Sequence, residues 1–235
     1  GRIYRIADGQ AEAMDSPTEL TLFGVWGAAP DDVWAVGGDP LASEPTAVIL
    51  HFDGTAWVDV TPDLDVGGAL FKVWGSSSSD VVVVGQAGTI ARYDGTGWTL
   101  DDSGVTATLF TVSGTAADEV WAVGGPPATI LRHDGSAWTA VDTGIPADVL
   151  NGVAAAPGGD VVAVGVGGVK LRLRAGQWRD ESFDGPMDDL HAVWLAPDGS
   201  GYAVGGNYNA PGGSERVGVI GYYGSDPPSA TLAAP

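Results

Sequence analysis

The chain has 235 residues, with 30 acidic and 10 basic side chains, and its formal net charge at pH 7 is −20. This charge argues against nucleic acid as a partner, because phosphates demand clustered Lys and Arg, and equally against anionic membrane surfaces. Cysteine is absent, which excludes disulfide bonds, thiolate metal sites and cysteine nucleophiles. No apolar run reaches the ~18 residues of a membrane helix, so direct membrane insertion is not expected.

Residues 1–15 predict a β-hairpin. The run Ile3-Tyr-Arg-Ile-Ala-Asp-Gly-Gln10 places Asp8-Gly9 after strand-forming residues, and an Asp-Gly pair in this position is a strong hairpin signal. The same phrase recurs later in the chain, where two other phrases always precede it. Those two phrases are missing before residue 3.

Residues 20–60 contain three phrases that define a repeat. The first, which we call the opening phrase, is Leu22-Phe-Gly-Val-Trp-Gly27; the second is Asp32-Val-Trp-Ala-Val-Gly37; the third is Ile49-Leu-His-Phe-Asp-Gly-Thr-Ala-Trp57. Each phrase is rich in Val, Ile, Leu and aromatic residues and is bounded by Gly, Pro, Asp or Ser, which is typical of a strand. No stretch keeps a helical period over three turns.

Four further copies follow, over residues 68–101, 108–142, 149–181 and 188–233. Four short antiparallel strands in roughly 40 residues, repeated along the chain, are the signature of a propeller blade. We therefore predict an all-β fold, with residues 1–235 forming a single β-propeller domain of four-stranded antiparallel blades. Six blades, with residues 1–15 as a partial first blade, are preferred.

The alternative is a five-bladed ring that residues 1–15 close as a clasp. The tail, residues 225–235, is rich in Pro and Ala and is expected to be an edge strand that runs into a linker.

Tryptophan recurs at three positions of the repeat. Because neighbouring blades meet face to face, residues repeated in place are expected to pack one blade on the next. A stacking surface for sugar rings is the alternative. The three sets are Trp26, Trp74 and Trp194; Trp34 and Trp121; and Trp57, Trp98, Trp138 and Trp178.

Aspartate precedes the turn glycine in the third phrase, at Asp53, Asp94 and Asp134. Aspartate tolerates left-handed backbone geometry and bonds the backbone within a turn, so these residues are predicted to be structural. Two residues before the aspartates stand His51, Arg92 and Arg132, which we expect to pair with acidic neighbours on the blade surface.

Two connections between second and third strands are longer than the others, at residues 39–46 and 207–216. Loops carry function in scaffold folds, and these loops share a face with the acidic turns between blades. A binding site is therefore expected there, with tolerated insertion as the alternative. Its candidate residues are Asp39, Glu44, Tyr208, Asn209 and Arg216.

No cofactor is expected. Calcium binding by the acidic loops stays open as an alternative, although no loop matches the EF-hand pattern. The three histidines are scattered and lack the spacing of metal ligands.

The repeat resembles known propeller families. Val-Gly-Gly at 36–38, 123–125 and 204–206, followed by an aromatic residue, Asp-Gly and Trp, is similar to the Kelch pattern. The Asp-Gly-Thr-x-Trp hairpin resembles the Asp-box of bacterial neuraminidase-type repeats, except that Asp and Gly are adjacent here. The opening phrases look like repeats of secreted or surface-anchored bacterial proteins.

These resemblances imply a fold and carry no activity across. A sialidase needs an arginine triad, whereas most arginines here occupy repeat positions, and a Kelch-like copper oxidase needs a cysteine. We predict a non-catalytic extracytoplasmic propeller, secreted, periplasmic or at the cell surface. Its partner is expected to be another protein, with a basic surface favoured by the charge. The alternatives are a carbohydrate-binding propeller or distant glycoside hydrolase, and a calcium-dependent adhesion module.

Overall fold

The computed structural model describes residues 1–182, 187–207 and 217–224. Within these residues the regular elements are strands, apart from two short 3-10 turns, η1 (Gln86–Gly88) and η2 (Val166–Gly168). The strands form six antiparallel sheets. The all-β prediction is therefore confirmed, whereas the predicted edge strand at 225–235 lies outside the described residues.

Each sheet follows the chain in order, and strands consecutive in sequence are hydrogen-bonded neighbours. The first sheet contains β1 (Ile3–Ala7) and β2 (Gln10–Met14). The second contains β3 (Thr21–Ala29), β4 (Asp32–Gly38), β5 (Ala47–Phe52) and β6 (Trp57–Asp59). The third contains β7 (Leu70–Ser77), β8 (Asp80–Gly85), β9 (Ile90–Tyr93) and β10 (Trp98–Leu100).

The remaining sheets repeat the same order of strands. The fourth contains β11 (Thr108–Ala116), β12 (Glu119–Gly125), β13 (Thr129–His133) and β14 (Trp138–Ala140). The fifth contains β15 (Leu150–Ala155), β16 (Val161–Gly165), β17 (Lys170–Arg174) and β18 (Gln177–Asp180). The sixth contains β19 (Leu190–Leu195), β20 (Gly201–Gly206) and β21 (Gly218–Tyr223).

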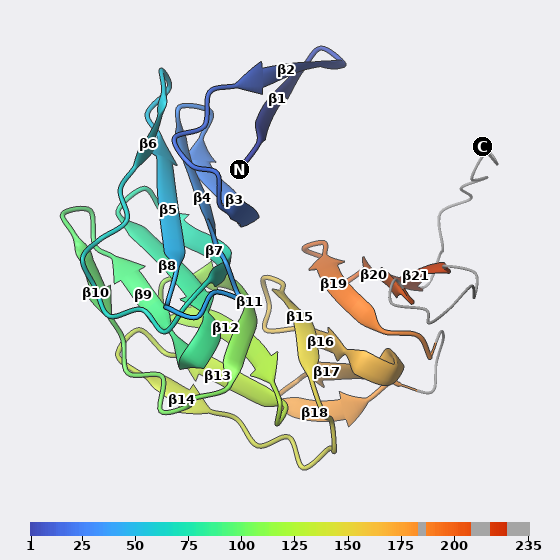
Figure 1. The fold of residues 1–235 in the computed structure, drawn as a ribbon. Coiled ribbons are helices and arrows are strands. Elements are labelled where there is room, and N and C mark those ends of the chain that lie inside the picture. The colour runs from blue at the N-terminus through green and yellow to red at the C-terminus, as the bar shows by residue number, and fades with distance from the viewer. Residues whose placement is uncertain (183–186, 208–216, 225–235) are drawn as a thin grey trace.

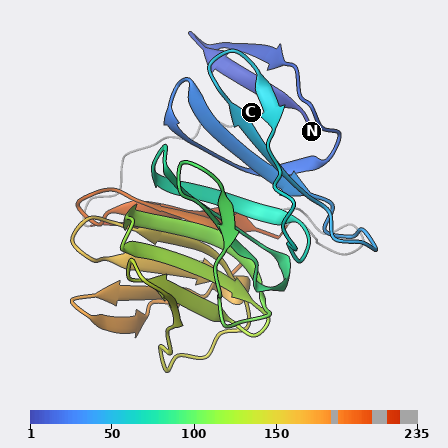
Figure 2. The same ribbon diagram turned by 90° about the vertical axis from the view of Figure 1, so that its left-hand side faces the viewer.

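The six sheets lie face to face in an arc (Figures 1 and 2), with β1–β2 at one end and β19–β21 at the other. The first strand of each complete sheet contacts the first strand of the next, so that β3, β7, β11, β15 and β19 line the inside of the arc. The predicted six blades, with a partial first blade, are confirmed. Among the described residues, β1 and β2 pair only with each other and do not join the sixth sheet.

The hydrophobic core lies between the sheets. Trp34, Val36 and Ile49 of the second sheet pack against Leu70 and Val73 of the third. Both faces of a middle sheet are covered in this way, which explains why β8 and β16 are nearly continuous runs of buried valine and alanine. Among the described residues no helix is long and apolar enough to cross a membrane.

The tryptophans follow the packing prediction with one exception. Trp34, Trp121 and Trp138 are buried, at 4%, 3% and 7% exposure. Trp194 is 59% exposed, so the prediction that it packs between blades is wrong. The physical reason is its place in the last sheet, beyond which the described residues provide no further sheet. The other five, Trp26, Trp57, Trp74, Trp98 and Trp178, are half-buried.

Candidate functional site

A contact between an acidic and a basic side chain recurs on one side of the second, third, fourth and fifth sheets. The acidic residue that begins the second strand meets the basic residue at the third position of the third phrase, because these two positions are neighbours across the strands. The pairs are Asp32–His51 at 2.8 Å, Asp80–Arg92 at 2.6 Å, Glu119–Arg132 at 2.6 Å and Asp160–Arg172 at 2.7 Å. The expected pairing of His51, Arg92 and Arg132 with acidic neighbours is therefore confirmed.

The turn aspartates are bound by their own hairpins. In the first complete sheet, Asp53 Oδ1 accepts hydrogen bonds from the backbone N–H groups of Thr55 and Ala56 and from the Thr55 hydroxyl, at 2.9, 3.0 and 2.7 Å. Asp94 and Asp134 make the same three contacts. The Thr55 hydroxyl is the main reason that the pKa of Asp53 is lowered to about 2. These residues act as turn formers, as predicted.

This bonding predicts how stability depends on acid. The pKa values of Asp53, Asp94 and Asp134 are lower in the folded chain than the ordinary 3.8. Their contribution to the free energy of unfolding is therefore complete above about pH 4 and is lost as the pH falls toward 2. The variant Asp53→Asn/Asp94→Asn/Asp134→Asn should lose less of its melting temperature between pH 4 and pH 2 than the native chain does, in thermal melts followed by circular dichroism.

The matched control removes three carboxylates that make no such turn contacts, in the variant Asp31→Asn/Asp63→Asn/Asp118→Asn. An equally flattened pH profile in this control would show that total charge, not turn bonding, is responsible.

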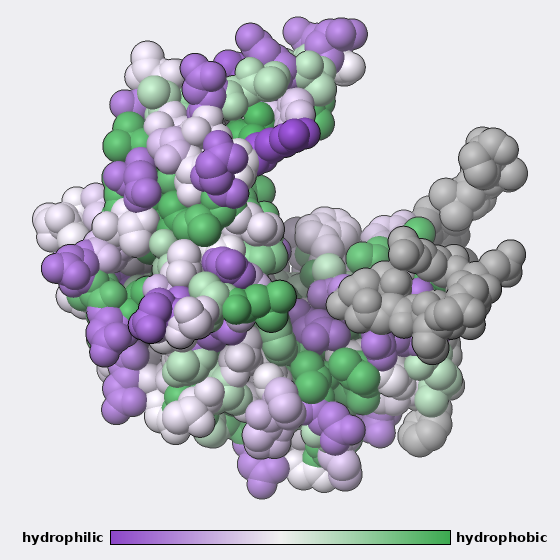
Figure 3. All heavy atoms as spheres, viewed as in Figure 1, coloured by the Kyte–Doolittle hydropathy of each residue, from purple (hydrophilic) through white to green (hydrophobic). Residues whose placement is uncertain are grey.

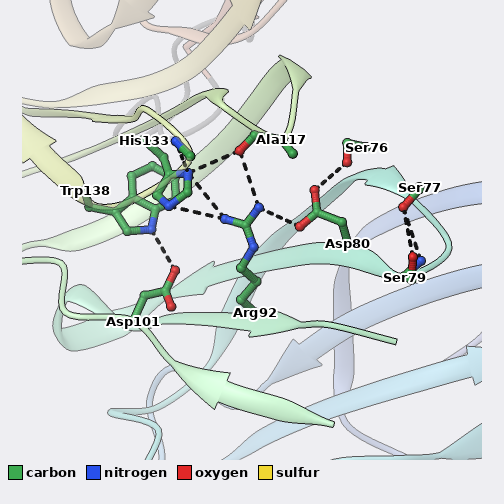
Figure 4. Close-up of polar contacts among 10 residues, drawn as sticks. Ser76, Ser77, Ser79, Asp80, Arg92, Asp101, Ala117, His133 and Trp138 are labelled. Atoms are coloured by element: carbon green, nitrogen blue, oxygen red, sulfur yellow. Dashed lines mark hydrogen bonds and ion pairs between the residues drawn. The ribbon is translucent and has the colours of Figure 1, made fainter. Parts of the chain in front are cut away.

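Between the third and fourth sheets the polar residues gather in a cleft of about 400 Å³ (Figure 4). Arg92 Nη2 lies 2.6 Å from Asp80 Oδ1 and also donates to the Ala117 carbonyl of the next sheet at 3.4 Å. Arg92 Nη1 lies 3.3 Å from His133 Nδ1. On the other side, Trp138 Nε1 donates to Asp101 Oδ2 at 3.0 Å. The third and fourth sheets are thus joined by polar contacts at the edge of this cleft.

The residues of this cleft are engaged with one another. The hydroxyl of Ser136, which lines the cleft, donates to Asp134 at 2.6 Å and has no base beside it. His133 is 5% exposed and packs against Trp138, with 5.1 Å between the rings. The arrangement therefore suits a joint between sheets better than nucleophilic catalysis.

The long loop of the second sheet is held against the third. Asp39 Oδ1 accepts from the Leu41 N–H at 3.0 Å, and the Gln86 side chain donates to the Pro40 carbonyl at 3.1 Å. The Glu44 carbonyl accepts from the Thr46 hydroxyl. The loop exposes the Leu41 side chain almost fully, at 92%. The other candidate residues, Tyr208, Asn209 and Arg216, lie outside the described residues.

Exposed carboxylates occur on both faces of the sheet array, and one set lies on the turns that connect one sheet to the next. These turns lie beside the loops between second and third strands. Gly67, on the turn before β7, is so close to Ala87, between β8 and β9, that an added Cβ would lie 2.4 Å from the Ala87 side chain. We call the carboxylates of these turns the acidic rim; its exposed members are Asp15, Glu19, Asp63, Asp65, Asp102, Asp142 and Asp148. The pairs described above use the acidic residues at the start of the second strands and, within the described residues, none of the carboxylates of this rim.

The inside of the arc forms a second pocket, of about 350 Å³, lined by the first strands of the sheets. Phe23, Phe71 and Phe110 follow one another along these strands, with ring centroids 5.2 and 5.6 Å apart. These phenylalanines lie outside the pocket lining, which includes Lys72 and His191. None of these residues was predicted as a site from the sequence. The available signal was the phenylalanine that recurs at the second position of three opening phrases, because equivalent first strands are expected to lie side by side around one axis.

No group of three or more His, Asp or Glu side chains that could hold a metal ion occurs in residues 1–182, 187–207 and 217–224. Calcium binding therefore has no supporting cluster in this part of the chain.

No family model and no curated protein matches the sequence. Solved structures do match. The structure of YCF48 bound to D1 peptide shares 20% identity, covers 82% of this chain and has a TM-score of 0.61. A streptogramin B lyase structure shares 14% identity over 86% of this chain, with a TM-score of 0.71. A nidogen/laminin complex shares 12% over 85%, with a TM-score of 0.59.

The chain is a β-propeller. The likeness shows the fold alone, because all three identities are below 25%. The propeller spans 63% of the matched YCF48 chain, 68% of the lyase chain and 80% of the chain matched in the nidogen/laminin complex.

Proposed function

We propose that this propeller is a non-catalytic binding module that acts outside the cytoplasm and takes a protein partner with a basic surface. The observation that carries the proposal is the acidic rim. Arg92, Arg132 and Arg172 are each paired with a carboxylate of their own sheet, whereas the carboxylates of the rim face solvent. A surface of one charge steers and selects partners of the opposite charge.

Two of the matched structures are complexes with a peptide or a protein, which supports a protein partner. The proposed secreted or surface location is supported by the likeness of the opening phrases to repeats of secreted bacterial proteins. The proposed Kelch or Asp-box affiliation is supported by the glycine pair and the Asp-Gly hairpin. Because one of the matched structures is a streptogramin B lyase, an enzymatic function is the second candidate. The polar cleft of Arg92 and His133 does not favour it, because its groups are bonded to one another.

The proposal predicts salt-sensitive binding of a basic peptide. A fluorescein-labelled peptide of alternating Lys and Gly should bind the chain, and its Kd should rise roughly tenfold between 50 and 300 mM NaCl, because exposed charges are screened. Fluorescence anisotropy measures both values. A peptide in which Glu replaces Lys should not bind.

The exposed carboxylates of the opposite face supply the control. The variant Asp63→Asn/Asp65→Asn removes two charges from the acidic rim and should raise the Kd of the Lys-Gly peptide several-fold. The variant Asp31→Asn/Asp118→Asn removes two charges from the turns between first and second strands, on the opposite face. Equal weakening by the two variants would contradict a site on the rim, and binding unaffected by salt would contradict the charge mechanism.

A further inference from the structure

The inside of the arc carries one side chain that the repeat does not explain. The third residue of the opening phrase is glycine, alanine or threonine in four of its five copies, at Gly24, Thr111, Gly152 and Ala192. The backbone of the next first strand lies close to this position. A Cβ at Gly24 would lie 2.9 Å from the Phe71 carbonyl oxygen, and one at Gly152 would lie 3.1 Å from Ala192 Cα. Packing therefore favours a small residue here, yet the third sheet has Lys72.

Lys72 is half-buried, and its ammonium group makes no ion pair or hydrogen bond within the described residues. The other lysine of the chain shows the contrast. Lys170 is 4% exposed, and its Nζ donates to the carbonyl oxygens of Gly168 and Ser182 at 3.2 and 3.1 Å. Lys170 thus stabilises the fold, whereas the three N–H donors of Lys72 are free to bind an acceptor.

Lys72 lines the pocket of about 350 Å³ on the inside of the arc. Figure 3 shows the molecule hollowed on this side. The chain has 30 acidic residues, yet none of the described residues that line the pocket is Asp or Glu. The charge of Lys72 is therefore not balanced inside the pocket. Because a cation that is partly removed from water gains from a counter-charge, the pocket favours an anion.

Two other polar residues of the lining already have partners. Thr111 Oγ1 donates to the Asn151 carbonyl oxygen at 2.7 Å, and His191 Nε2 lies 3.4 Å from the Gly206 carbonyl oxygen. Much of the remaining wall is apolar. Three of its valines are at most 3% exposed, namely Val73, Val112 and Val153. A ligand that meets Lys72 therefore also contacts a largely apolar surface.

The indole rings of this wall are fixed by the next sheet. The Trp26 ring lies against Gly75, where an added Cβ would lie 2.6 Å from Trp26 Cη2, and Trp74 lies against Gly114 at 2.8 Å. Farther along the arc the sizes are exchanged, because Ala154 takes the tryptophan position of the fifth sheet and Leu195 takes the glycine position of the sixth. These two residues belong to one buried cluster. The wall is thus closely packed before any ligand binds.

We propose that this pocket binds a small organic monoanion, a carboxylate with a flat apolar body. The carboxylate accepts hydrogen bonds from the Lys72 ammonium group, and the apolar body lies against the valines and the indole rings. The ligand carries a single charge, because the net charge of −20 repels an anion more strongly the more charge it carries. A pocket of this size, with one charged group in an apolar wall, is typical of a site for a small molecule.

The first test compares ligands of related shape. Phenylacetate has a carboxylate and a flat ring, whereas phenylacetamide has a neutral amide in place of the carboxylate. Isothermal titration calorimetry should show one phenylacetate bound per chain, with a Kd about tenfold lower than that of phenylacetamide, because hydrogen bonds between charged groups are the stronger ones. Acetate, which lacks the ring, should bind about tenfold more weakly than phenylacetate, because it loses the apolar contacts.

Variants of Lys72 assign the charge to one residue. Lys72→Met keeps the length of the side chain and removes the ammonium group, so phenylacetate and phenylacetamide should bind this variant with equal affinity. Lys72→Arg restores a cation and should keep the preference for phenylacetate. The matched control is Arg174→Ala, which removes a 66%-exposed basic side chain outside the pocket and should leave both Kd values unchanged. A near-native melting temperature of Lys72→Met shows that its lost preference does not come from unfolding.

Three results would each overturn the proposal: no binding of phenylacetate to the native chain, equal affinity of the native chain for phenylacetate and phenylacetamide, or a preference for phenylacetate that persists in Lys72→Met. Acetate that binds as tightly as phenylacetate would contradict the apolar part of the site. The Lys-Gly peptide tests the acidic rim, which does not include Lys72, so its result is independent of these.

Discussion

Gly124→Ala is expected to lower the free energy of unfolding by about 3 kcal/mol, a large effect for a single methyl group. Gly124 ends the repeated phrase Ala-Val-Gly and pairs with Leu109 of the neighbouring strand. A Cβ at this position would lie 1.9 Å from the Thr108 carbonyl oxygen, and the backbone cannot move away without breaking the pairing. Urea titration followed by tryptophan fluorescence measures the change.

The control is a glycine of the same sheet array that has free space. Gly97 lies in a hairpin turn, nothing is within 4 Å of an added Cβ, and the two equivalent turns have alanine, Ala56 and Ala137. Gly97→Ala should change the free energy of unfolding by less than ~0.5 kcal/mol. If Gly124→Ala were as mild as this control, close backbone approach would not be the reason for the repeated glycine.

The second large effect concerns the Asp160–Arg172 ion pair. Arg172 Nη2 lies 2.7 Å from Asp160 Oδ2, and the two side chains are only 12% and 19% exposed. Asp160→Ala leaves the guanidinium without its counter-charge in a mostly buried place. We expect the free energy of unfolding to fall by about 3 kcal/mol, measured by the same urea titration.

Two further variants separate charge from packing. Arg174 lies 3.8 Å from the same carboxylate but is 66% exposed, so Arg174→Ala should cost less than about 1 kcal/mol. The double variant Asp160→Leu/Arg172→Met should be more stable than Asp160→Ala, because it leaves no unpaired charge. A double variant less stable than Asp160→Ala would contradict this explanation.

The repeat predicts the parts of the structure that depend on local chemistry. The hairpin turns at Asp53, Asp94 and Asp134 follow from Asp-Gly geometry. The pairing of Arg92 with Asp80 follows from strand register within one sheet. Both involve residues whose separation along the chain is short, so the sequence pattern contains the information.

Contacts between sheets were not predictable in the same way. Arg92 of the third sheet contacts His133 of the fourth, and this contact depends on how the one sheet is placed against the other. Trp194 shows the other limit. Its place in the repeat equals that of Trp26 and Trp74, yet its exposure is set by what lies next to the last sheet, which the repeat does not contain.

The complementary sizes of Trp26 and Gly75 have a consequence for how such an array grows. Each unit carries a protruding indole on one side and a matching depression on the other, so a duplicated unit of this type fits between its parents without adjustment. At the junction of Ala154 and Leu195 the shapes are exchanged, and a copy placed there requires compensating changes in its neighbours. Lengthening by gene duplication is therefore easiest among the units that keep the Trp-Gly pair.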